Sequence, residues 1–354
     1  MQAVILAGGQ GTRLRPLTLT CPKPIVPLLN VPFLHYQLAW LRQHGIREAV
    51  LACSYGVDEI RRVLGGRHAA GIRLSYAIER EPLGTAGALR NAADAGNGPL
   101  VVLNGDVLTD LDLSGVIRLH AERGAQATIS LTSVDDPTRY GLVETEPDGR
   151  MLRFLEKPEP EHVTVQTINA GVYILERTLL ELIPTGRVVS MEREFFPELL
   201  ARGIGFFGHT ISAYWLDIGN AETYRQAQVD LLTGTVTTGV QPPGIRRGNL
   251  WIGDESSISA EARLTGPAVI GRRARLASGC RVGPFSVLGD RTTMERGSHI
   301  DGAVLWEDVR VGPGARLSAC VVADRCRIGA NAEIGPGAVL GAGSVVPDGA
   351  RLPA

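Results

Sequence analysis

Lysine is almost absent from this sequence, and its two occurrences are informative. Of the 36 basic residues only Lys23 and Lys157 are lysine, and the rest are arginine. A lysine ammonium is a compact point charge, which the planar arginine guanidinium does not replace. Both lysines stand beside prolines, in Pro22-Lys23-Pro24 and in Glu156-Lys157-Pro158. We infer two sites at which the chemistry requires an ammonium group.

A glycine-rich turn follows the first apolar run of the chain. It reads Leu6-Ala7-Gly8-Gly9-Gln10-Gly11-Thr12-Arg13-Leu14. Turns of this kind let backbone N–H groups approach a phosphate closely. The string is not G-x-G-x-x-G, because Leu14 takes the third glycine position, and it is not a P-loop, because no Gly-Lys-Ser/Thr follows. The glycines alone are equally compatible with a tight turn that binds nothing.

Two aspartates that follow apolar runs are candidates for a metal site. Asp106 belongs to Asn104-Gly105-Asp106 and Asp217 to Trp215-Leu216-Asp217-Ile218-Gly219. Each also has a structural alternative, since Asp106 could cap a turn and Asp217 could cap a helix that begins near Asn220. The five cysteines form no C-x-x-C pair and the histidines no close pair, which argues against a disulfide framework, a zinc site and Cys or His catalysis.

Taken in chain order, these strings resemble the signature of the nucleotidyltransferase family that activates sugar phosphates, G-G-x-G-T-R-L followed by P-K-P. Four further strings resemble the family's base loop, sugar-facing segment, E-K-P element and N-A-G element: Pro82-Leu83-Gly84-Thr85-Ala86-Gly87, Tyr140-Gly141, Glu156-Lys157-Pro158 and Asn169-Ala170-Gly171. Asn104-Gly105-Asp106 and the W-x-D-I-G string resemble the family's two magnesium-binding segments. The resemblance covers the whole N-terminal domain, residues 1–228, and part of the family also carries a β-helix after it.

The resemblance implies a role for each of these residues. Those expected to bind the nucleotide are Leu6, Gly8, Gly9, Gly11, Thr12, Pro82, Gly84, Thr85 and Gly105, and those expected to face the sugar are Gly141, Glu156 and Asn169. The expected catalytic residues are Arg13, Lys23, Lys157, Asp106 and Asp217. Arg13 would draw charge off the leaving phosphates, Lys23 and Lys157 would hold the two reacting phosphates, and Asp106 and Asp217 would hold Mg²⁺.

The expected reaction is an in-line displacement in which a sugar phosphate attacks the α-phosphorus of a nucleoside triphosphate and pyrophosphate leaves. The second pKa of the attacking phosphate is about 6, so it is largely ionised near neutral pH and needs no general base. The site must supply charge neutralisation and alignment of phosphates that repel one another.

The elements that position these residues are predicted by apolar periodicity. In residues 1–228 short apolar runs alternate with amphipathic stretches, which indicates an α/β, Rossmann-like domain with a mostly parallel sheet. Ligands bind beyond the carboxyl ends of such strands. The expected strands are Ala3–Ala7, Ala49–Cys53, Leu74–Ile78, Leu100–Leu103 and Ala127–Leu131, and the expected helices are Phe33–His44, Val57–Leu64, Ala86–Ala93 and Leu113–Arg123.

The period changes after a breaker-rich linker over residues 229–248. From Ile252 to Ile300 an apolar residue recurs every six positions, and the pattern continues to Val346 with two slips of one residue, after Ile300 and after Leu317. This hexapeptide period is typical of a parallel β-helix, in which each inward side chain stacks on the previous coil. We expect a left-handed parallel β-helix over residues 249–354.

Within the family, the Pro-Leu-Gly-Thr-Ala-Gly string and a β-helix of this length resemble most the mannose-1-phosphate guanylyltransferases, which favours GTP and mannose 1-phosphate. A glucose-1-phosphate thymidylyltransferase or another sugar-1-phosphate nucleotidylyltransferase is the alternative. A different class is a non-catalytic subunit that senses a sugar nucleotide. A third is a two-headed enzyme whose β-helix transfers an acyl group, for which His299 is the only histidine available in that part of the chain.

Composition limits the partners. The net charge is −1 and the arginines are scattered along the sequence, so we expect no nucleic-acid partner. No apolar run reaches 18 residues, and the N-terminus lacks a signal-peptide pattern, so we expect a cytoplasmic protein without membrane contact. Because the open coil ends of a β-helix need covering, we also expect a homo-oligomer.

Overall fold

The computed structural model describes residues 1–65, 68–93 and 96–353. The chain forms two compact units. Unit 1 comprises Met1–Gly9 and Leu34–Asp217, and unit 2 comprises Gln10–Phe33 and Ile218–Ala354. The chain therefore passes between the units three times: inside the glycine-rich string, between Phe33 and Leu34, and inside the W-x-D-I-G string. The domain boundaries inferred from the sequence, at residues 228 and 249, stay a prediction.

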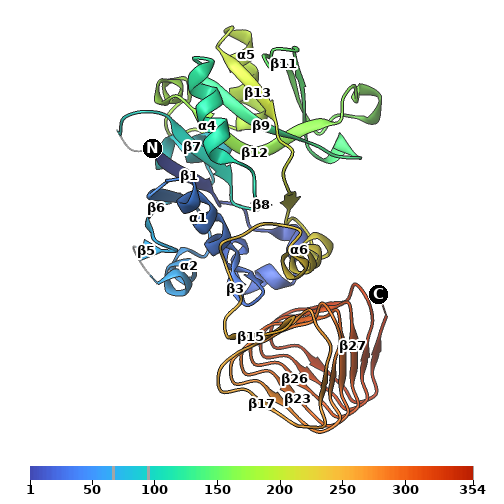
Figure 1. Cartoon of the computed structure of the whole chain (residues 1–354). Coiled ribbons are helices and arrows are strands. Elements are labelled where there is room, and N and C mark those ends of the chain that lie inside the picture. The colour runs from blue at the N-terminus through green and yellow to red at the C-terminus, as the bar shows by residue number, and fades with distance from the viewer. Residues whose placement is uncertain (66–67, 94–95, 354) are drawn as a thin grey trace. The chain divides into compact units, whose positions relative to one another are not determined.

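Unit 1 is built on a ten-stranded mixed sheet with the main order β11-β10-β12-β7-β1-β4-β6-β5 (Figure 1). Strand β1 pairs in parallel with β4 and β7, and β4 with β6. Strand β12 then adds antiparallel pairing to β7, β9 and β10. The strands of the sheet are β1 (Gln2–Leu6), β4 (Glu48–Cys53), β5 (His68–Ala69), β6 (Ile72–Ile78), β7 (Leu100–Asn104), β9 (Ala127–Ser133), β10 (Gly141–Thr145), β11 (Met151–Glu156), β12 (Thr167–Leu175) and β13 (Phe206–Thr210).

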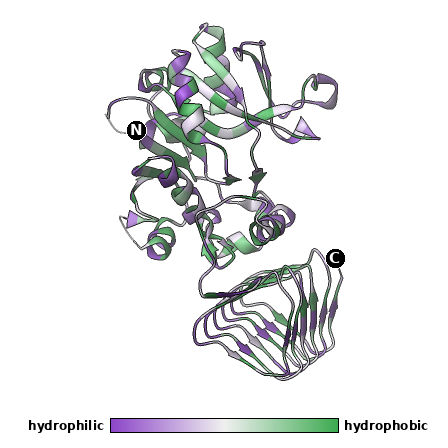
Figure 2. Ribbon diagram, in the orientation of Figure 1, coloured by the Kyte–Doolittle hydropathy of each residue, from purple (hydrophilic) through white to green (hydrophobic). Residues whose placement is uncertain are grey.

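In the described part of unit 1 five α-helices flank this sheet; the bounds of the first four lie close to those predicted, and the fifth was not predicted. They are α1 (Phe33–Gln43), α2 (Val57–Leu64), α3 (Gly84–Ala92), α4 (Leu113–Glu122) and α5 (Phe196–Ala201). Helix α3 packs on β1, β4 and β6, and α4 on β9 and β12. The central strands are apolar (Figure 2), and the core under them includes Val4, Val102 and Ile129, all fully buried. The strands β7-β1-β4-β6 pair in parallel, as strand-helix alternation predicts. The fifth predicted strand, β9, instead pairs antiparallel with β12, and β5 at the edge pairs antiparallel with β6.

Unit 2 contains the parallel β-helix, whose strands stack as rungs of three sheets (Figure 1). The first sheet has β15 (Ile245–Arg247), β16 (Leu250–Ile252), β19 (Ala268–Ile270), β22 (Val287–Leu288), β25 (Val304–Leu305), β28 (Val321–Val322) and β31 (Val339–Leu340). The second has β17 (Ser257–Ile258), β20 (Arg275–Leu276), β23 (Thr293–Met294), β26 (Arg310–Val311), β29 (Arg327–Ile328) and β32 (Val345–Val346). The third has β18 (Arg263–Leu264), β21 (Arg281–Val282), β24 (His299–Asp301), β27 (Arg316–Ser318), β30 (Glu333–Ile334) and β33 (Arg351–Leu352).

The register of the coils confirms the six-residue period and both slips. Ile270 pairs with Leu288, Leu288 with Leu305, and Leu305 with Val322, so inward residues remain stacked on inward residues. The two shortened turns contain Gly302 and Ala319, both with positive φ (57° and 43°). Full-length turns also contain a left-handed residue, such as Arg291 three positions after Leu288, whereas Gly302 and Ala319 lie two positions after Ile300 and Leu317. Each slip is therefore one residue removed from a turn, while the apolar column stays in line.

The segment Gln10–Phe33 belongs to unit 2 together with helix α6 (Ala221–Thr233). The segment carries β2 (Pro27–Leu28) and β3 (Val31–Pro32). The fully buried Gln228 of α6 accepts a hydrogen bond from Leu29 N (2.8 Å) and donates one to Pro27 O (3.0 Å). Because α6 continues to Thr233, the first residues of the predicted linker are helical.

Helix α6 and the segment also contact the β-helix within unit 2. Trp306 Nε1 donates to the hydroxyl of Tyr224 at 2.9 Å, and Asn30 Nδ2 donates to Leu288 O at 2.8 Å. On the first sheet of the β-helix the outward residues Val287 and Val304 are about as buried as a core residue, each 1% exposed. The β-helix is thus part of the support for the segment that carries Arg13 and Lys23. Across the described residues, no helix is long and apolar enough to cross a bilayer.

Replacing Gln228 by Met should weaken this attachment. The substitution nearly keeps the side-chain volume but leaves Leu29 N–H buried without an acceptor, which destabilises a protein by about 1–3 kcal/mol. A urea unfolding curve should therefore shift to a lower midpoint. Gln226→Met, on the exposed side of the same helix, is the matched control and should shift it little. Equal midpoints for the two variants would contradict the proposed support.

Candidate nucleotidyl-transfer site

The glycine-rich string begins in unit 1, directly after β1. Ser54 Oγ donates to Gly8 O at 2.8 Å, which holds the end of β1 to the end of β4. A Cβ built on Gly9 would meet no described atom within 4 Å. The backbone at Gly9 is therefore open for close approach by a ligand, as expected of a phosphate-binding turn.

The same string continues in unit 2 as a tightly packed turn. Gly11 has φ +62°, and a Cβ there would lie 3.0 Å from Thr18 Cγ2 and 3.2 Å from Lys23 Cβ. Thr18 Oγ1 donates to Gly11 O at 2.7 Å. Glycine is required at this position because the backbone is left-handed and the space is filled. The consequence is that the stem of Lys23 lies against the turn, with Thr12 in the short 3₁₀ helix that follows it.

Within unit 2 the guanidinium of Arg13 lies close to Gly219 of the W-x-D-I-G string. A Cβ on Gly219 would lie 2.9 Å from Arg13 Nη1, so glycine at 219 leaves room for the guanidinium. The side chain of Arg13 is exposed, and that of Lys23 is half-buried. Two strings about 200 residues apart in the sequence are thus brought into contact. Helix α6 is capped by Asn220 in a capping box with Thr223, so the alternative in which Asp217 caps this helix is wrong.

In unit 1 the two candidate metal ligands lie at one pair of neighbouring strands, Asp106 just before β8 and Asp217 at the end of its partner strand. Asp106 directly precedes β8 (Val107–Thr109), which pairs antiparallel with β14 (Trp215–Asp217). Asp217 is the register partner of Val107, the residue next to Asp106. Both carboxylates are half-buried. No group of three or more His, Cys, Asp or Glu side chains fit to hold a metal occurs among the residues described.

The turn that contains Asp106 is held in place by hydrogen bonds to its backbone groups. Gly105 N donates to Leu6 O at 2.8 Å, and Gln37 Nε2 donates to Asn104 O (2.9 Å) and Val107 O (3.0 Å). A Cβ on Gly105 would lie 2.8 Å from Leu6 O, so only glycine fits. This pair of aspartates fits Mg²⁺, which proteins commonly bind through one or two carboxylates together with substrate phosphate oxygens.

Three more strings of the signature meet in unit 1 around Trp215. Its indole Nε1 donates to Ala170 O of the N-A-G string at 2.8 Å, and its ring packs edge-on against Tyr140 at 5.4 Å between centroids. The carbonyl of Tyr140 accepts a hydrogen bond from Lys157 N at 2.9 Å. Trp215 therefore links β14, and with it Asp217, to the E-K-P and N-A-G strings.

Lys157 is held in an unusual backbone conformation. Its φ is +50°, which costs a non-glycine residue free energy and persists only where the surroundings enforce it. The ammonium is exposed, and Nζ lies 3.9 Å from Glu156 Oε1. Glu156 is paired in register with Gly141, whose missing side chain leaves room for Phe154 Cζ, 2.5 Å from a built Cβ.

Asn169 and Thr85 both use their side chains to hold the local backbone. Asn169 donates to the Tyr173 hydroxyl and accepts from Gly171 N, both at 2.8 Å, across an irregularity in β12. Thr85 Oγ1 donates to Glu192 Oε2 (2.9 Å) and accepts from Met191 N (2.8 Å), while Leu83 occupies the N-cap of α3. Thr85 is therefore not the N-cap of this helix, and its contact with a base stays a prediction.

The loop Pro82–Thr85 is pinned by close backbone contacts. Gly84 has φ +72°, and a Cβ there would lie 2.5 Å from Val189 O. Val189 O also accepts hydrogen bonds from Ala86 N (3.0 Å) and Gly87 N (3.3 Å) at the start of α3. Pro82 is exposed at the front of this loop. Glycine at 84 is thus explained by packing, whether or not a base binds there.

Glu79 is a candidate that sequence reasoning missed. It follows β6 and is 6% exposed, with Oε2 accepting from Leu83 N at 3.0 Å. Its Oε1 is buried and has no hydrogen-bond partner in the described part of the chain. The same oxygen lies 3.7 Å from a Cβ built on Gly8. An acceptor without a donor, between the glycine-rich turn and the base loop, points to a ligand.

Comparison with known proteins identifies the family. Residues 2–234 match the family described as nucleotidyl transferase, and residues 247–352 match the EIF2B subunit epsilon LbH domain. The chain belongs to the nucleotidyl transferase family. The second match agrees with a left-handed β-helix in the C-terminal part of unit 2.

Curated relatives and a solved structure indicate which kind of nucleotidyl transferase this chain is. The chain is 37% identical to mannose-1-phosphate guanylyltransferase from Mycobacterium tuberculosis, over 89% of this chain and 82% of the relative. It is 34% identical to UTP–glucose-1-phosphate uridylyltransferase from Synechocystis, over 90% and 86%. HddC from Yersinia pseudotuberculosis, solved in complex with GMP-PN, is 32% identical with a TM-score of 0.57, over 65% of this chain and 99% of that one. The protein is a sugar-1-phosphate nucleotidyltransferase.

The environment of Glu156 predicts a pH-dependent stability effect. Burial, and then the negative charge of Glu192, raise the pKa of the Glu156 carboxyl above its ordinary 4.5. The folded state therefore binds the carboxyl proton more tightly than the unfolded state does. At a pH above the folded-state pKa the ionised Glu156 destabilises the fold, and this destabilisation disappears as the pH falls below the ordinary value of 4.5.

Glu156→Gln should raise the melting temperature at pH 7 by about 1–3 °C, with the difference shrinking toward pH 4. The lost contact with Lys157 offsets little of this gain, because that ammonium is exposed. Glu146→Gln, exposed in the turn of the same hairpin, is the control. A difference that is constant from pH 4 to pH 7 would rule the account out.

Proposed function

We propose that this chain is a mannose-1-phosphate guanylyltransferase: it transfers the guanylyl group of GTP to mannose 1-phosphate with Mg²⁺ and releases pyrophosphate. The observation that carries the choice of base is the buried Glu79 carboxylate beside the base loop. The similarity to the Mycobacterium tuberculosis guanylyltransferase and to HddC in complex with GMP-PN supports it.

The Watson–Crick edge of guanine suits a buried carboxylate. It presents two adjacent donors, the ring N1–H and the exocyclic N2 amino group, and a carboxylate is a pure acceptor. Uracil and thymine present one N–H between two carbonyl oxygens, which a carboxylate repels. A buried acceptor that lacks a donor costs about 1–3 kcal/mol, and a guanine would remove that cost. Glu79 therefore favours GTP over UTP and dTTP.

Replacing Glu79 by Gln should reduce this preference, because the amide brings one donor where guanine requires an acceptor. We expect kcat/KM with GTP to fall about 10- to 100-fold while the value with UTP changes little. The measurement is pyrophosphate release with four nucleoside triphosphates against mannose 1-phosphate and glucose 1-phosphate. Glu81→Gln, exposed in the same loop, is the matched control. Equal losses with GTP and UTP would refute base reading by Glu79.

We further propose how the chain's own residues act on the phosphates. The backbone at Gly8, Gly9 and Gly11 cradles the triphosphate, and Arg13 draws charge off its β- and γ-phosphates. Lys23 and Lys157 hold the two reacting phosphate groups against their mutual repulsion. Asp106 and Asp217 would hold Mg²⁺, which supplies Lewis acidity and a template when bound. No base is required, because the attacking phosphate is already ionised.

The sugar side of the site is proposed from the same strings. Gly141, Glu156 and Asn169 lie on β10, β11 and β12, next to one another in the sheet. Glu156 has the carboxylate suited to accept sugar hydroxyls, and its raised pKa reflects burial that a bound sugar would increase. Homo-oligomerisation and a cytoplasmic location stay predictions.

Lys157→Ala should lower kcat about 10²- to 10³-fold, because an ammonium that stabilises developing charge is lost. Binding of GTP, measured by calorimetry without the sugar phosphate, should change little. Lys157→Arg should restore activity only in part, since a guanidinium is larger and planar. A Lys157→Ala enzyme with normal kcat would remove this residue from the mechanism.

A further inference from the structure

One sheet of the β-helix carries two columns of outward side chains that are rich in arginine. The sheet is β17-β20-β23-β26-β29-β32. The strand column contains Arg275, Thr293, Arg310 and Arg327, which are register partners on consecutive rungs. Neighbouring rungs are about 4.8 Å apart. The turn column, two residues earlier on each coil, contains Arg273, Arg291, Asp308 and Arg325.

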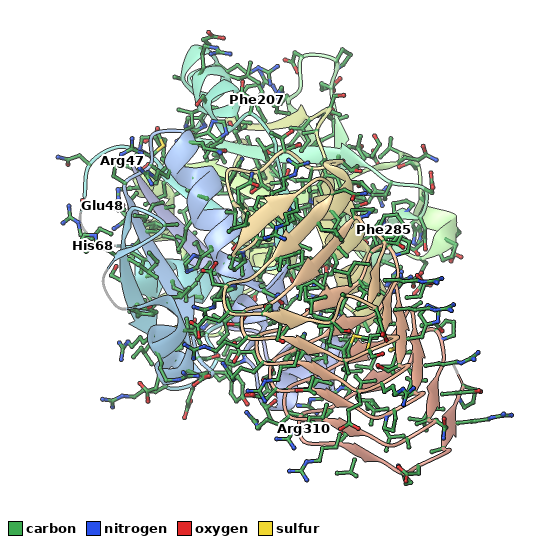
Figure 3. The ribbon with its side chains drawn as sticks, turned by 60° about the horizontal axis from the view of Figure 1, so that its bottom comes forward. Arg47, Glu48, His68, Phe207, Phe285 and Arg310 are labelled. Carbon is green, nitrogen blue, oxygen red and sulfur yellow. The ribbon has the colours of Figure 1, made fainter. Side chains whose placement is uncertain are left out.

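Together these residues line a groove of about 490 Å³, which we call the arginine groove: Arg273, Arg275, Arg291, Thr293, Asp308, Arg310, Arg325 and Arg327. Six arginines and one aspartate leave it a formal charge of +5. All six guanidinium-bearing residues are exposed, and Arg310 lies at the outer edge of the coils in Figure 3. The groove lies wholly within unit 2.

Carboxylates neutralise only part of this charge. Arg291 donates to Asp308 Oδ1 (2.7 Å) and to Glu307 Oε2 (2.6 Å), and the pKa of Arg291 is raised by these bonds. Arg273 donates to Glu255 at 3.0 and 3.2 Å. The remaining four, Arg275, Arg310, Arg325 and Arg327, form no ion pair within 4 Å in the part of the chain that the structure describes. Like charges at this spacing repel one another unless an anion lies between them.

The other arginine-bearing sheet of the β-helix lacks this arrangement. Its strand column has four exposed arginines, Arg263, Arg281, Arg316 and Arg351. The turn positions two residues before them carry no basic side chain, because they are Glu261, Gly279, Gly314 and Gly349. A single column of arginine side chains leaves no groove beside it, whereas two adjacent columns of long side chains enclose a groove between them.

We propose that the arginine groove binds a compact small molecule that bears several phosphate groups. A guanidinium donates in a fork that matches the oxygens of a phosphate. Of the four arginines without an ion pair, Arg310, Arg325 and Arg327 lie on two successive rungs and Arg275 lies two rungs before Arg310, a spread that favours several linked anions over a single one. The volume lies in the range of small-molecule sites. The groove has no aromatic lining residue on which a nucleic-acid base could stack, which argues against single-stranded nucleic acid.

The test is a calorimetric titration of the full-length protein with tripolyphosphate at 50 and 300 mM NaCl. The double variant Arg310→Gln/Arg327→Gln should lose a binding component, with affinity falling about tenfold or more. The control Arg281→Gln/Arg316→Gln removes the same charge from the other sheet and should keep it. Orthophosphate should bind at least about tenfold more weakly than tripolyphosphate, and the higher salt should weaken the component, because the groove is exposed.

The catalytic residues are not altered in either double variant, so both should retain nucleotide-sugar synthesis and normal melting, which checks that they fold. The calorimetric titration measures tripolyphosphate binding in the absence of the enzymatic reaction, so its result does not depend on which sugar nucleotide the enzyme makes. Equal affinities for tripolyphosphate in the two double variants would overturn the proposal. Tighter binding of poly-glutamate than of tripolyphosphate at the groove would also overturn it, because the partner would then be an acidic protein.

Discussion

The contact between Gly105 and Leu6 is the constraint on which the arrangement of unit 1 depends. Gly105 N–H reaches Leu6 O at 2.8 Å, and the same oxygen would lie 2.8 Å from any Cβ at position 105. The parallel strands β1 and β7 consequently end side by side, and the chain turns at once into β8 with Asp106 at the turn. Strand β8 then pairs with β14 and so selects the position of Asp217. A side chain at 105 would force these strand ends apart and disturb both carboxylates together.

Glycine has three different structural roles in the glycine-rich string and the W-x-D-I-G string. At Gly11 the backbone is left-handed and crowded by Thr18 and Lys23, whereas at Gly9 the space beside the backbone is open. At Gly219 the missing side chain makes room for the guanidinium of Arg13. The first and last strings of the signature also contain two of the three places where the chain passes between the two compact units. Their residues are therefore supported partly by the sheet of unit 1 and partly by α6 and the β-helix of unit 2.

Arginine and lysine occur at different kinds of position in this protein, and the chemistry of the two side chains explains the difference. Arginine forms the forked ion pairs along the β-helix, as between Arg272 and Asp290 at 2.8 and 2.9 Å, and it lines the arginine groove. Lysine is kept for two positions in the nucleotidyltransferase strings. A point charge on a flexible stem can follow a phosphate as it moves along a reaction coordinate, while a rigid fork is better suited to holding an anion in one place.

The sequence alone determined the α/β and β-helix architecture, the ends of α2 and β4 to within a residue, and the strings that carry Arg13, Lys23, Asp106, Lys157 and Asp217. These features depend on local periodicity and on unusual residue types, which a linear reading can detect. Only the tertiary structure decided that Trp215 joins three of the strings, that the Gln10–Phe33 segment belongs with the β-helix, and that Glu79 has a buried oxygen without a donor. It also decided that arginines 17 or 18 residues apart form a groove. Each of these findings depends on which strands become neighbours in the fold. A single glutamate or a scattered arginine in the sequence does not indicate which residues will lie beside it.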